Sequence, residues 1–338
     1  MSRVFIHGIG AVSPAGWGVA AMRDALDAGV PVPMVGLDRP CRAVPLSVRR
    51  VPAPEARPAF MAHPRLRRTS PITHFAIAAA IEAVGEDAAQ IASGAMRLGI
   101  VFCAFGGCVG YSRRFYSEVL REPATASPMV FPETVFNAPA SHLAAYFATT
   151  AVNYTVVGDQ GEMVKALALA ADWLLADRVD SCLVVASEEA DWLTGDALRL
   201  LGRGAPLAEG AGAVCLRREP SSVELAAVTG PELFLAGHGR GPAARRMSAA
   251  LGAVGDPGDL LVDGLAGGKA DTAEAAAWEG WSGRRISPRQ ILGEGLGASS
   301  AWQVVVAADA IRRGVARRAV VSVVGSNEQA VGAELRAG

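Results

Sequence analysis

Apolar residues recur along the chain in two patterns. Continuous apolar runs rich in β-branched residues predict buried strands, whereas apolar residues three or four positions apart predict helices that cover them. Strands are predicted at 4–13, 98–104, 154–157, 181–187, 212–216, 223–228, 260–263, 319–324 and 331–335. Helices are predicted at 18–28, 70–85, 142–148, 161–174, 243–251 and 299–313, with another from Asp271. Because strands and helices alternate throughout, the sequence predicts an α/β fold.

The clearest of these units is a strand, a turn and a helix within residues 154–174. An apolar run ends at Gly158-Asp159, and apolar residues then follow at helical spacing, so we expect a buried strand that feeds a long helix. Gln160 lies at the turn, beside the first free N–H groups of the helix, where the helix dipole favours an anion or a thiolate. A glutamine amide can form hydrogen bonds, but it neither ionises near neutral pH nor attacks a thioester.

The same pattern occurs twice. Ala170-Ala-Asp172 precedes an apolar strand at 182–185, and Ala307-Ala-Asp309 precedes a second one at 319–322 after the same interval. The two aspartates lie 137 positions apart (309 − 172). We therefore expect a duplicated βα half and a five-layered α/β/α/β/α sandwich, divided into residues 1–217 and 218–338. Residues 30–68, rich in proline and arginine, are expected to form an irregular surface excursion.

Composition narrows the function classes. Hydrophobic residues make up 51% of the 338 residues and charged residues 19%, and the mean hydropathy is +0.27, so part of the apolar excess could form a subunit interface. The net charge is −1 and no basic residues form a stripe, so the charge pattern does not indicate binding to nucleic acid or to an anionic membrane. No apolar run has the length of a signal peptide or a transmembrane helix. We expect a soluble cytoplasmic protein.

No metal and no cofactor are expected. The cysteines show none of the spacings that ligate metals; they are Cys41, Cys103, Cys108, Cys182 and Cys215. Gly8-Ile-Gly10 follows a predicted strand but lacks the third glycine of a dinucleotide-binding fingerprint, because Ser13 stands there. None of the five histidines lies in a pattern that indicates a catalyst.

Several segments in a fixed order together resemble one known family. They are Val4 to Pro14, Ser127 to Pro132, Asn137 to His142, the turn at Gln160, Glu209 to Ala213, Asp271 to Glu274 and Gly293 to Ala301. In these segments the chain resembles β-ketoacyl synthases of the thiolase superfamily from end to end. The resemblance implies a thiolase-like fold. In condensing members, a cysteine nucleophile and two histidines carry the reaction.

The resemblance also implies that the catalytic residues are lost here. Gln160 stands at the position of the cysteine, Asp263 and Glu294 stand at those of the histidines, and Arg289 replaces a lysine. No acyl-enzyme can form, and ionised carboxylates would repel an enolate or oxyanion. We favour a salt bridge with an arginine such as Arg289 that plugs the old site. A carboxylate pair with acid–base chemistry of its own is the alternative.

The function that the resemblance implies is that of a chain-length-factor-like subunit. Such a subunit forms a heterodimer with an active ketosynthase, acts on acyl carrier protein only through that complex, and shapes the acyl tunnel. Polyketide, aryl polyene or fatty-acid-type synthesis would be the setting. A dimer-interface excursion is expected at about 106–157, with interface or tunnel residues Tyr111, Phe115, Tyr116, Phe131, Asn137 and Tyr154. The alternative is that these aromatic residues are ordinary residues of the hydrophobic core. The functional alternatives are a malonyl-carrier-protein decarboxylase that makes starter units and a purely structural subunit.

Overall fold

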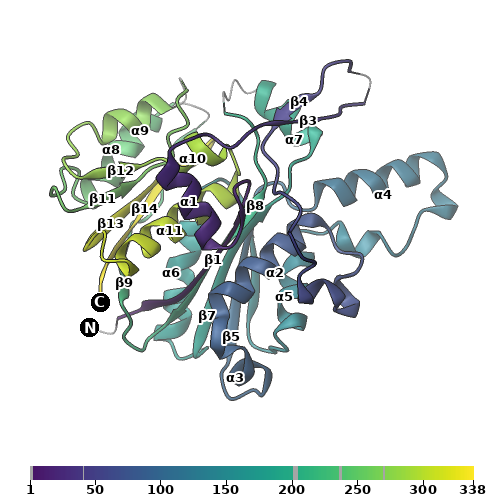
Figure 1. The fold of residues 1–338 in the computed structure, drawn as a ribbon, viewed down its shortest axis with the longest axis horizontal. Coiled ribbons are helices and arrows are strands. Elements are labelled where there is room, and N and C mark those ends of the chain that lie inside the picture. The colour runs from purple at the N-terminus through teal and green to yellow at the C-terminus, as the bar shows by residue number, and fades with distance from the viewer. Residues whose placement is uncertain (1–2, 41, 201–204, 236–237, 269–270) are drawn as a thin grey trace.

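The fold is that of a computed structural model that describes residues 3–40, 42–200, 205–235, 238–268 and 271–338. A large mixed sheet runs through the molecule, with helices on both faces (Figure 1). Its strands are β1 (Phe5–Ser13), β2 (Gly16–Trp17), β5 (Leu98–Ala104), β6 (Asn153–Val157), β7 (Ser181–Glu188), β8 (Gly210–Arg217), β9 (Val223–Val228), β10 (Glu232–Leu233), β11 (Leu260–Val262), β12 (Arg284–Ile286), β13 (Arg318–Val324) and β14 (Gln329–Ala337). A separate hairpin is formed by β3 (Val35–Leu37) and β4 (Leu46–Val48).

The two halves of the sheet repeat one topology. The N-terminal half has the order β6-β5-β7-β8-β1, and the C-terminal half has the order β12-β11-β13-β14-β9. In each half the first two neighbouring pairs are parallel and the last two are antiparallel. The halves meet where β1 pairs with β9 at Phe5 and Glu224. The duplicated βα half is therefore confirmed. The boundary between residues 217 and 218, which falls between β8 and β9, stays a prediction.

Helices form three layers around the two half-sheets. They are α1 (Val19–Ala28), α2 (Pro71–Val84), α3 (Ala88–Ala92), α4 (Val109–Arg121), α5 (Ala138–Tyr146), α6 (Glu162–Leu175), α7 (Trp192–Leu200), α8 (Arg240–Ala250), α9 (Thr272–Ala277), α10 (Pro288–Leu292) and α11 (Gly297–Arg312). The helices α2 and α5 cover the N-terminal half-sheet, α8 and α9 cover the C-terminal one, and α6 and α11 lie between the two (Figure 1). The predicted five-layered sandwich is confirmed.

The middle layer explains the high apolar content. The largest core cluster joins both half-sheets through α6 and α11, with Val184, Leu167, Val305 and Val321 among its members. Because both faces of α11 are covered, every residue from Gly297 to Ile311 is buried. Trp302 on this helix donates one bifurcated hydrogen bond, 3.1 Å to each of the carbonyl oxygens of Val12 and Ala211 in the opposite half. The helix thus anchors one half to the other.

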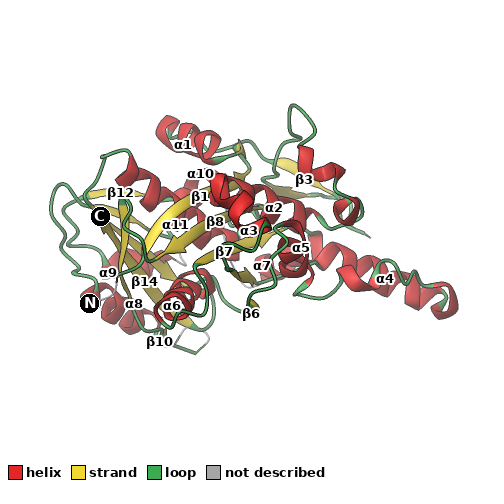
Figure 2. Cartoon of the chain, turned by 90° about the horizontal axis from the view of Figure 1, so that it is seen from below, coloured by secondary structure: helices red, strands yellow, loops and turns green. Residues whose placement is uncertain are grey.

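An arm between β5 and β6 departs from the layered body. The helix α4, which is not among the predicted elements, projects away from the sheet and has no buried residue (Figures 1 and 2). The chain returns through the short 3₁₀ helices Pro123–Thr125 and Phe131–Glu133. The helix α5 then begins at Ala138, four residues earlier than predicted, because Pro139 suits the first turn of a helix.

Two local predictions are wrong. The strand before Gln160, predicted to be buried, is the outermost strand of its half-sheet, and Tyr154 and Val157 on it are 55% and 48% exposed. Residues 30–68 are more than a surface excursion, because Leu46, Phe60 and Leu66 from this segment are buried. In both places the sequence shows which residues are apolar but not what they contact.

Candidate functional site

The turn at Gln160 is held by the end of a neighbouring strand. After β6 ends, the N–H of Gly158 donates to the carbonyl oxygen of Ala104 at the end of β5, over 3.2 Å. Gln160 follows two residues later, just before α6 begins, and is only 6% exposed. The sequence therefore places a buried amide at the N-terminal end of a 14-residue helix.

Both polar atoms of the Gln160 side chain are bonded. Its Nε2 donates to Ser326 Oγ over 2.6 Å, and its Oε1 accepts a hydrogen bond of 2.9 Å from the N–H of Ser326. Ser326 belongs to the loop after β13, in the other half of the molecule. A buried amide that is satisfied in this way is a structural link and offers no nucleophile.

The neighbouring carboxylate strengthens this link. Asp159 accepts hydrogen bonds from the N–H groups of Gln160, Ser326, Asn327 and Glu328 at 2.7–3.1 Å. Gly325 makes the approach possible, because a Cβ built at that position would lie 2.0 Å from Asp159 Oδ2. The turn of one half and the loop of the other therefore close around one carboxylate.

Glu294 is neutralised by an ion pair. It lies between α10 and α11, is 1% exposed, and its Oε2 binds the guanidinium of Arg289. Its Oε1 accepts hydrogen bonds from the N–H of Leu296 at 2.8 Å and from Ser299 Oγ at 3.3 Å. Arg289 also donates to the carbonyl oxygen of Gly264. The expected salt bridge with Arg289 thus forms at Glu294, whereas Oδ2 of Asp263 has no hydrogen-bond partner among the described residues.

Asp263 and Glu274 form a second buried acidic group. Burial raises the pKa of Asp263 above its ordinary value, although its Oδ1 accepts hydrogen bonds from Ser287 Oγ at 2.5 Å and from the N–H of Leu265 at 3.2 Å. Burial likewise raises the pKa of Glu274, and the nearby Asp263 adds to that effect. Glu274 accepts hydrogen bonds from Ser322 Oγ at 2.5 Å and from the N–H of Gly264 at 3.0 Å. For Glu274, burial and the neighbouring carboxylate of Asp263 both favour the protonated form of the side chain.

The three positions that the resemblance pointed to, Gln160, Asp263 and Glu294, are linked near the carboxyl ends of strands β11 and β13. The neighbouring strands β11 and β13 are parallel, so Asp263 after β11 and Ser326 after β13 leave the sheet at the same edge. Gln160 is hydrogen-bonded to Ser326. Glu294 binds Arg289, which in turn donates to the carbonyl oxygen of Gly264, the residue after Asp263. The contacts are hydrogen bonds and an ion pair, with no thiol and no imidazole among them.

Glu188, which was not among the predicted site residues, lies beside Gly297 at the start of α11. It ends β7, is 1% exposed, and accepts hydrogen bonds from the N–H groups of Phe105 at 2.5 Å and Gly106 at 3.0 Å. Burial raises the pKa of Glu188 to about 8, while backbone hydrogen bonds, including one from Gly297 at the start of α11, oppose the rise. Two adjacent glutamates at the end of an apolar strand were the only signal in the sequence.

The described cysteines are buried, and histidine side chains such as that of His142 are bonded elsewhere in the structure. In the part of the chain that the structure describes, the cysteines are free and buried, and Cys41 lies outside it. Burial raises the pKa of Cys108 to about 12 and that of Cys215 to about 11, so these thiols stay protonated and unreactive. Among the histidines, His142 bonds Glu133 at 2.7 Å and His7 bonds the carbonyl oxygen of Glu219 at 2.7 Å.

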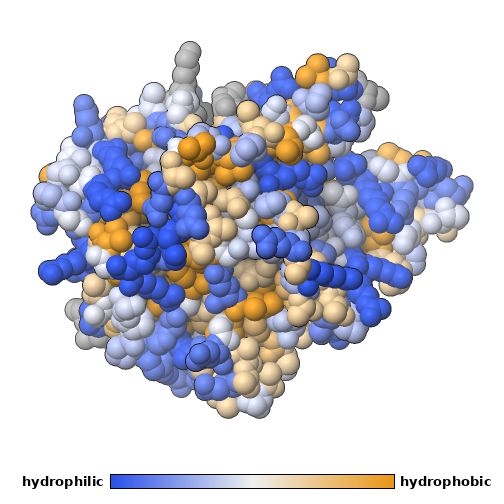
Figure 3. Space-filling view, in the orientation of Figure 1, coloured by the Kyte–Doolittle hydropathy of each residue, from blue (hydrophilic) through white to orange (hydrophobic). Residues whose placement is uncertain are grey.

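Four of the six predicted interface residues are exposed, and the other two, Tyr111 and Phe115, are half-buried. Tyr116, Phe131 and Tyr154 are 63%, 54% and 55% exposed. Phe115 packs on Phe131 with ring centroids 5.3 Å apart, and Tyr111 is half-buried and donates from its hydroxyl to the carbonyl oxygen of Arg68 at 2.7 Å. The sixth, Asn137, is exposed at the start of α5. The arm stands away from the body, and the face seen in Figure 3 is mostly hydrophilic along it.

Within the described residues, no cluster of His, Cys, Asp and Glu has the form of a metal site. The same residues include no helix with the length and apolar character needed to span a membrane.

Comparison with known proteins identifies the fold. No family model and no curated protein matches the sequence. The ishigamide ketosynthase/chain length factor superposes with a TM-score of 0.81 at 21% identity, over 99% of each chain. A ketosynthase in complex with its chain length factor from Xenorhabdus doucetiae gives 0.80 at 14% identity, over 100% of this chain and 98% of the other.

A third structure extends the comparison. A type II polyketide synthase acyl-carrier protein in complex with its ketosynthase bound to the hexaketide gives a TM-score of 0.80 at 14% identity, over 100% of this chain and 99% of the other. The chain therefore has the thiolase-like fold of ketosynthases and chain length factors.

Proposed function

We propose that this protein is a non-condensing ketosynthase-like subunit that pairs with an active ketosynthase. The observation that carries the proposal is the set of exposed apolar side chains along β6 and the arm. These side chains are Tyr116, Leu120, Met129, Phe131, Val135, Phe136, Tyr154 and Val157, each at least 40% exposed. So many large apolar groups on neighbouring segments favour a surface that a partner covers.

The edge of the sheet supports the same proposal. Among the described residues, the strand β6 pairs only with β5, so its other side presents backbone groups that no described strand pairs with. An exposed apolar edge strand promotes aggregation unless another chain covers it, and addition of a strand to such an edge is a common mode of recognition. The similar structures described as complexes of a ketosynthase with a chain length factor provide the class of partner.

The chemistry at the old site supports a non-condensing role. A condensing subunit needs a nucleophile that holds the acyl chain and donors that stabilise an enolate. Here the nucleophile position is an amide bonded to Ser326, and Glu294 is paired with Arg289. Condensation would therefore belong to the partner, and acyl carrier protein would act through the complex.

The arm gives this subunit a means to influence the product. We propose that Phe115, Tyr116 and Phe131 close the far end of the partner's acyl tunnel, so that their bulk limits the chain length. Tyr111 would hold the arm in place, because its hydroxyl is bonded to the backbone before α2. The pathway would be of polyketide, polyene or fatty-acid type.

Co-expression with a ketosynthase partner tests the proposal. The expected result is a single heterodimer peak in gel filtration and condensation only by the pair. Phe131→Ala in this subunit should then lengthen the products while the heterodimer persists. Unchanged products with less complex would contradict the tunnel role and leave a purely structural subunit. Condensation or malonyl decarboxylation by the isolated chain would contradict the proposal itself.

A further inference from the structure

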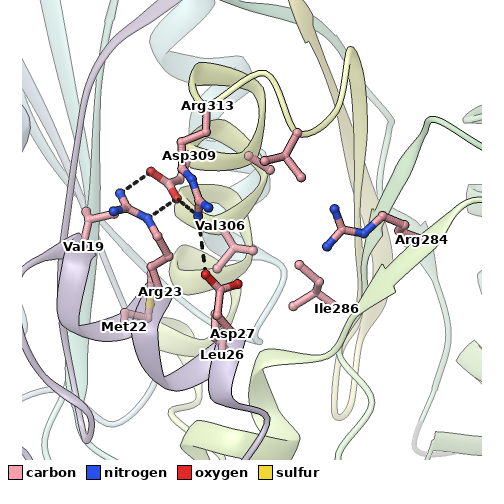
Figure 4. Close-up of a pocket in the computed structure, with 12 residues that line it drawn as sticks. Val19, Met22, Arg23, Leu26, Asp27, Arg284, Ile286, Val306, Asp309 and Arg313 are labelled. Carbon is pink, nitrogen blue, oxygen red and sulfur yellow. Dashed lines mark hydrogen bonds and ion pairs between the residues drawn. The ribbon is translucent and has the colours of Figure 1, made fainter.

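A small cavity lies between α1, β12 and α11, away from the residues of the old catalytic site. It has a volume of about 140 Å³. Its apolar wall comes from all three elements and from the turn after α11, and is made by Met22, Leu26, Ile286, Val306, Ala310 and Val315. Figure 4 shows that charged side chains surround this wall.

Two arginines at the cavity are already paired. Arg23 binds Asp309 through two of its nitrogens, at 2.8 and 2.7 Å. Arg313 lies 3.7 Å from a carboxylate oxygen of Asp27 and from one of Asp309. Two carboxylates therefore balance two guanidinium groups on the helical side of the cavity.

A third arginine is unpaired. Arg284 on β12 points toward the cavity from the opposite side (Figure 4). Its side chain forms no hydrogen bond or ion pair with any residue in the described ranges, although its backbone N–H donates to the carbonyl oxygen of Asp259. The cavity thus combines an apolar wall with one uncompensated positive charge.

We propose that this cavity binds a small organic carboxylate, with the apolar body against the wall and the carboxylate on Arg284. A guanidinium matches a carboxylate with two parallel N–H donors, which favours this anion over a neutral amide. The size is suitable for about six carbons, because an engineered apolar cavity of roughly 150 Å³ binds benzene. The inference does not depend on the proposed function, since the lining includes none of Gln160, Asp263 and Glu294.

Isothermal titration of the full chain with benzoate and with benzamide tests the site, because the two ligands share their shape and differ in charge. Saturable one-site binding of benzoate is expected, at least about tenfold tighter than that of benzamide. Arg284→Gln should reduce benzoate binding to the level of benzamide. Arg67→Gln, at another exposed arginine in the N-terminal half, should leave both affinities unchanged.

A cavity-filling variant tests the apolar wall separately. Ala310 on α11 is 7% exposed, so Ala310→Leu should abolish binding of both ligands while Arg284 remains. The thermal unfolding midpoint of each variant shows that it is folded. Equal affinity for benzoate and benzamide, or unchanged benzoate binding in Arg284→Gln or Ala310→Leu, would overturn the proposal. So would displacement of benzoate by an equal concentration of inorganic phosphate, because the site would then select only charge.

Discussion

Each half of the molecule contains the same unit, in which the chain passes from an edge strand to a helix of the middle layer. The two copies differ in their exposed residues and in the contacts that hold the connection. The first copy runs from β6 through Gln160 to α6, and the second runs from β12 through Glu294 to α11. On β6 the exposed residues include Tyr154 and Val157, whereas on β12 they are Arg284 and Arg285. The connection from β6 to α6 is held by the neutral amide of Gln160, and the connection from β12 to α11 is held by the ion pair of Glu294 with Arg289.

The difference between the two edges agrees with the proposal that only one of them forms an interface. Duplication creates two open sheet edges, and each is an opportunity for strand addition. Short length and exposed cations make β12 unsuitable for another strand, while the apolar β6 stays open to one. Identical topology therefore does not imply identical use.

The largest effect is expected at the ion pair of the second copy. Arg289→Met would leave Glu294 buried without a counterion and should lower the free energy of unfolding by about 3–5 kcal/mol. Guanidinium unfolding measures it. The double variant with Glu294→Gln should recover part of the loss, because the unpaired charge is gone. A loss below about 1 kcal/mol for the single variant would show that the pair is unimportant.

The next effect concerns the edge of the first copy. Tyr154→Glu would place a charge in the proposed interface and should weaken the heterodimer by about 2–4 kcal/mol, as measured by analytical ultracentrifugation. Arg284→Asp on the equivalent edge strand β12 is the matched control and should leave assembly unchanged. If the two substitutions had equal effects on assembly, the proposed asymmetry of the edges would be wrong.

Gln160→Ala tests the amide of the first copy. Ser326 would lose both of its hydrogen bonds to this side chain, which should cost about 1–3 kcal/mol in the free energy of unfolding. Condensation by the heterodimer should continue at its former rate, because the amide has no chemical role. A parallel fall of malonyl decarboxylation would instead favour a starter-unit enzyme.

The smallest effect is a pH dependence near the start of the second copy's helix. The pKa of Glu188 is about 8 in the folded protein, above the ordinary value of 4.5. The folded state therefore holds this proton where the unfolded state has lost it, so stability decreases as the pH rises from about 4.5 to 8. Relative to Glu188→Gln, the protein should lose at most about 1.4 kcal/mol between pH 6 and 7. Parallel stability curves would contradict this assignment.

The fold could be predicted from the sequence because its signals are local. The apolar runs at β5, β7 and β13 are bounded by turn residues, and the repeated interval from helix to strand reveals the duplication. The burial of β6 could not be predicted, because apolar residues look alike whether they face a core or a partner. The helix α4 was not predicted either, although Tyr111, Phe115 and Val119 lie four residues apart on one face of it.

The contacts of the candidate site likewise include near ones, which the sequence could predict, and distant ones, which it could not. Arg289 and Glu294 are five residues apart, so their pairing could be proposed from the sequence. Ser326 is 166 positions from Gln160, and Phe105 is 83 positions from Glu188, so these contacts exist only once the halves have assembled. No local pattern encodes such partners.

The carboxylate of Asp159 has a mechanical consequence. It gathers N–H groups from residue 160 of the first half and from residues 326, 327 and 328 of the second. Rotation of one half against the other would break several of these bonds together, so the protein should respond to force and to a bound partner as a single stiff block. A protease cut in the link between β8 and β9 should yield a nicked protein whose two pieces still migrate together under native conditions.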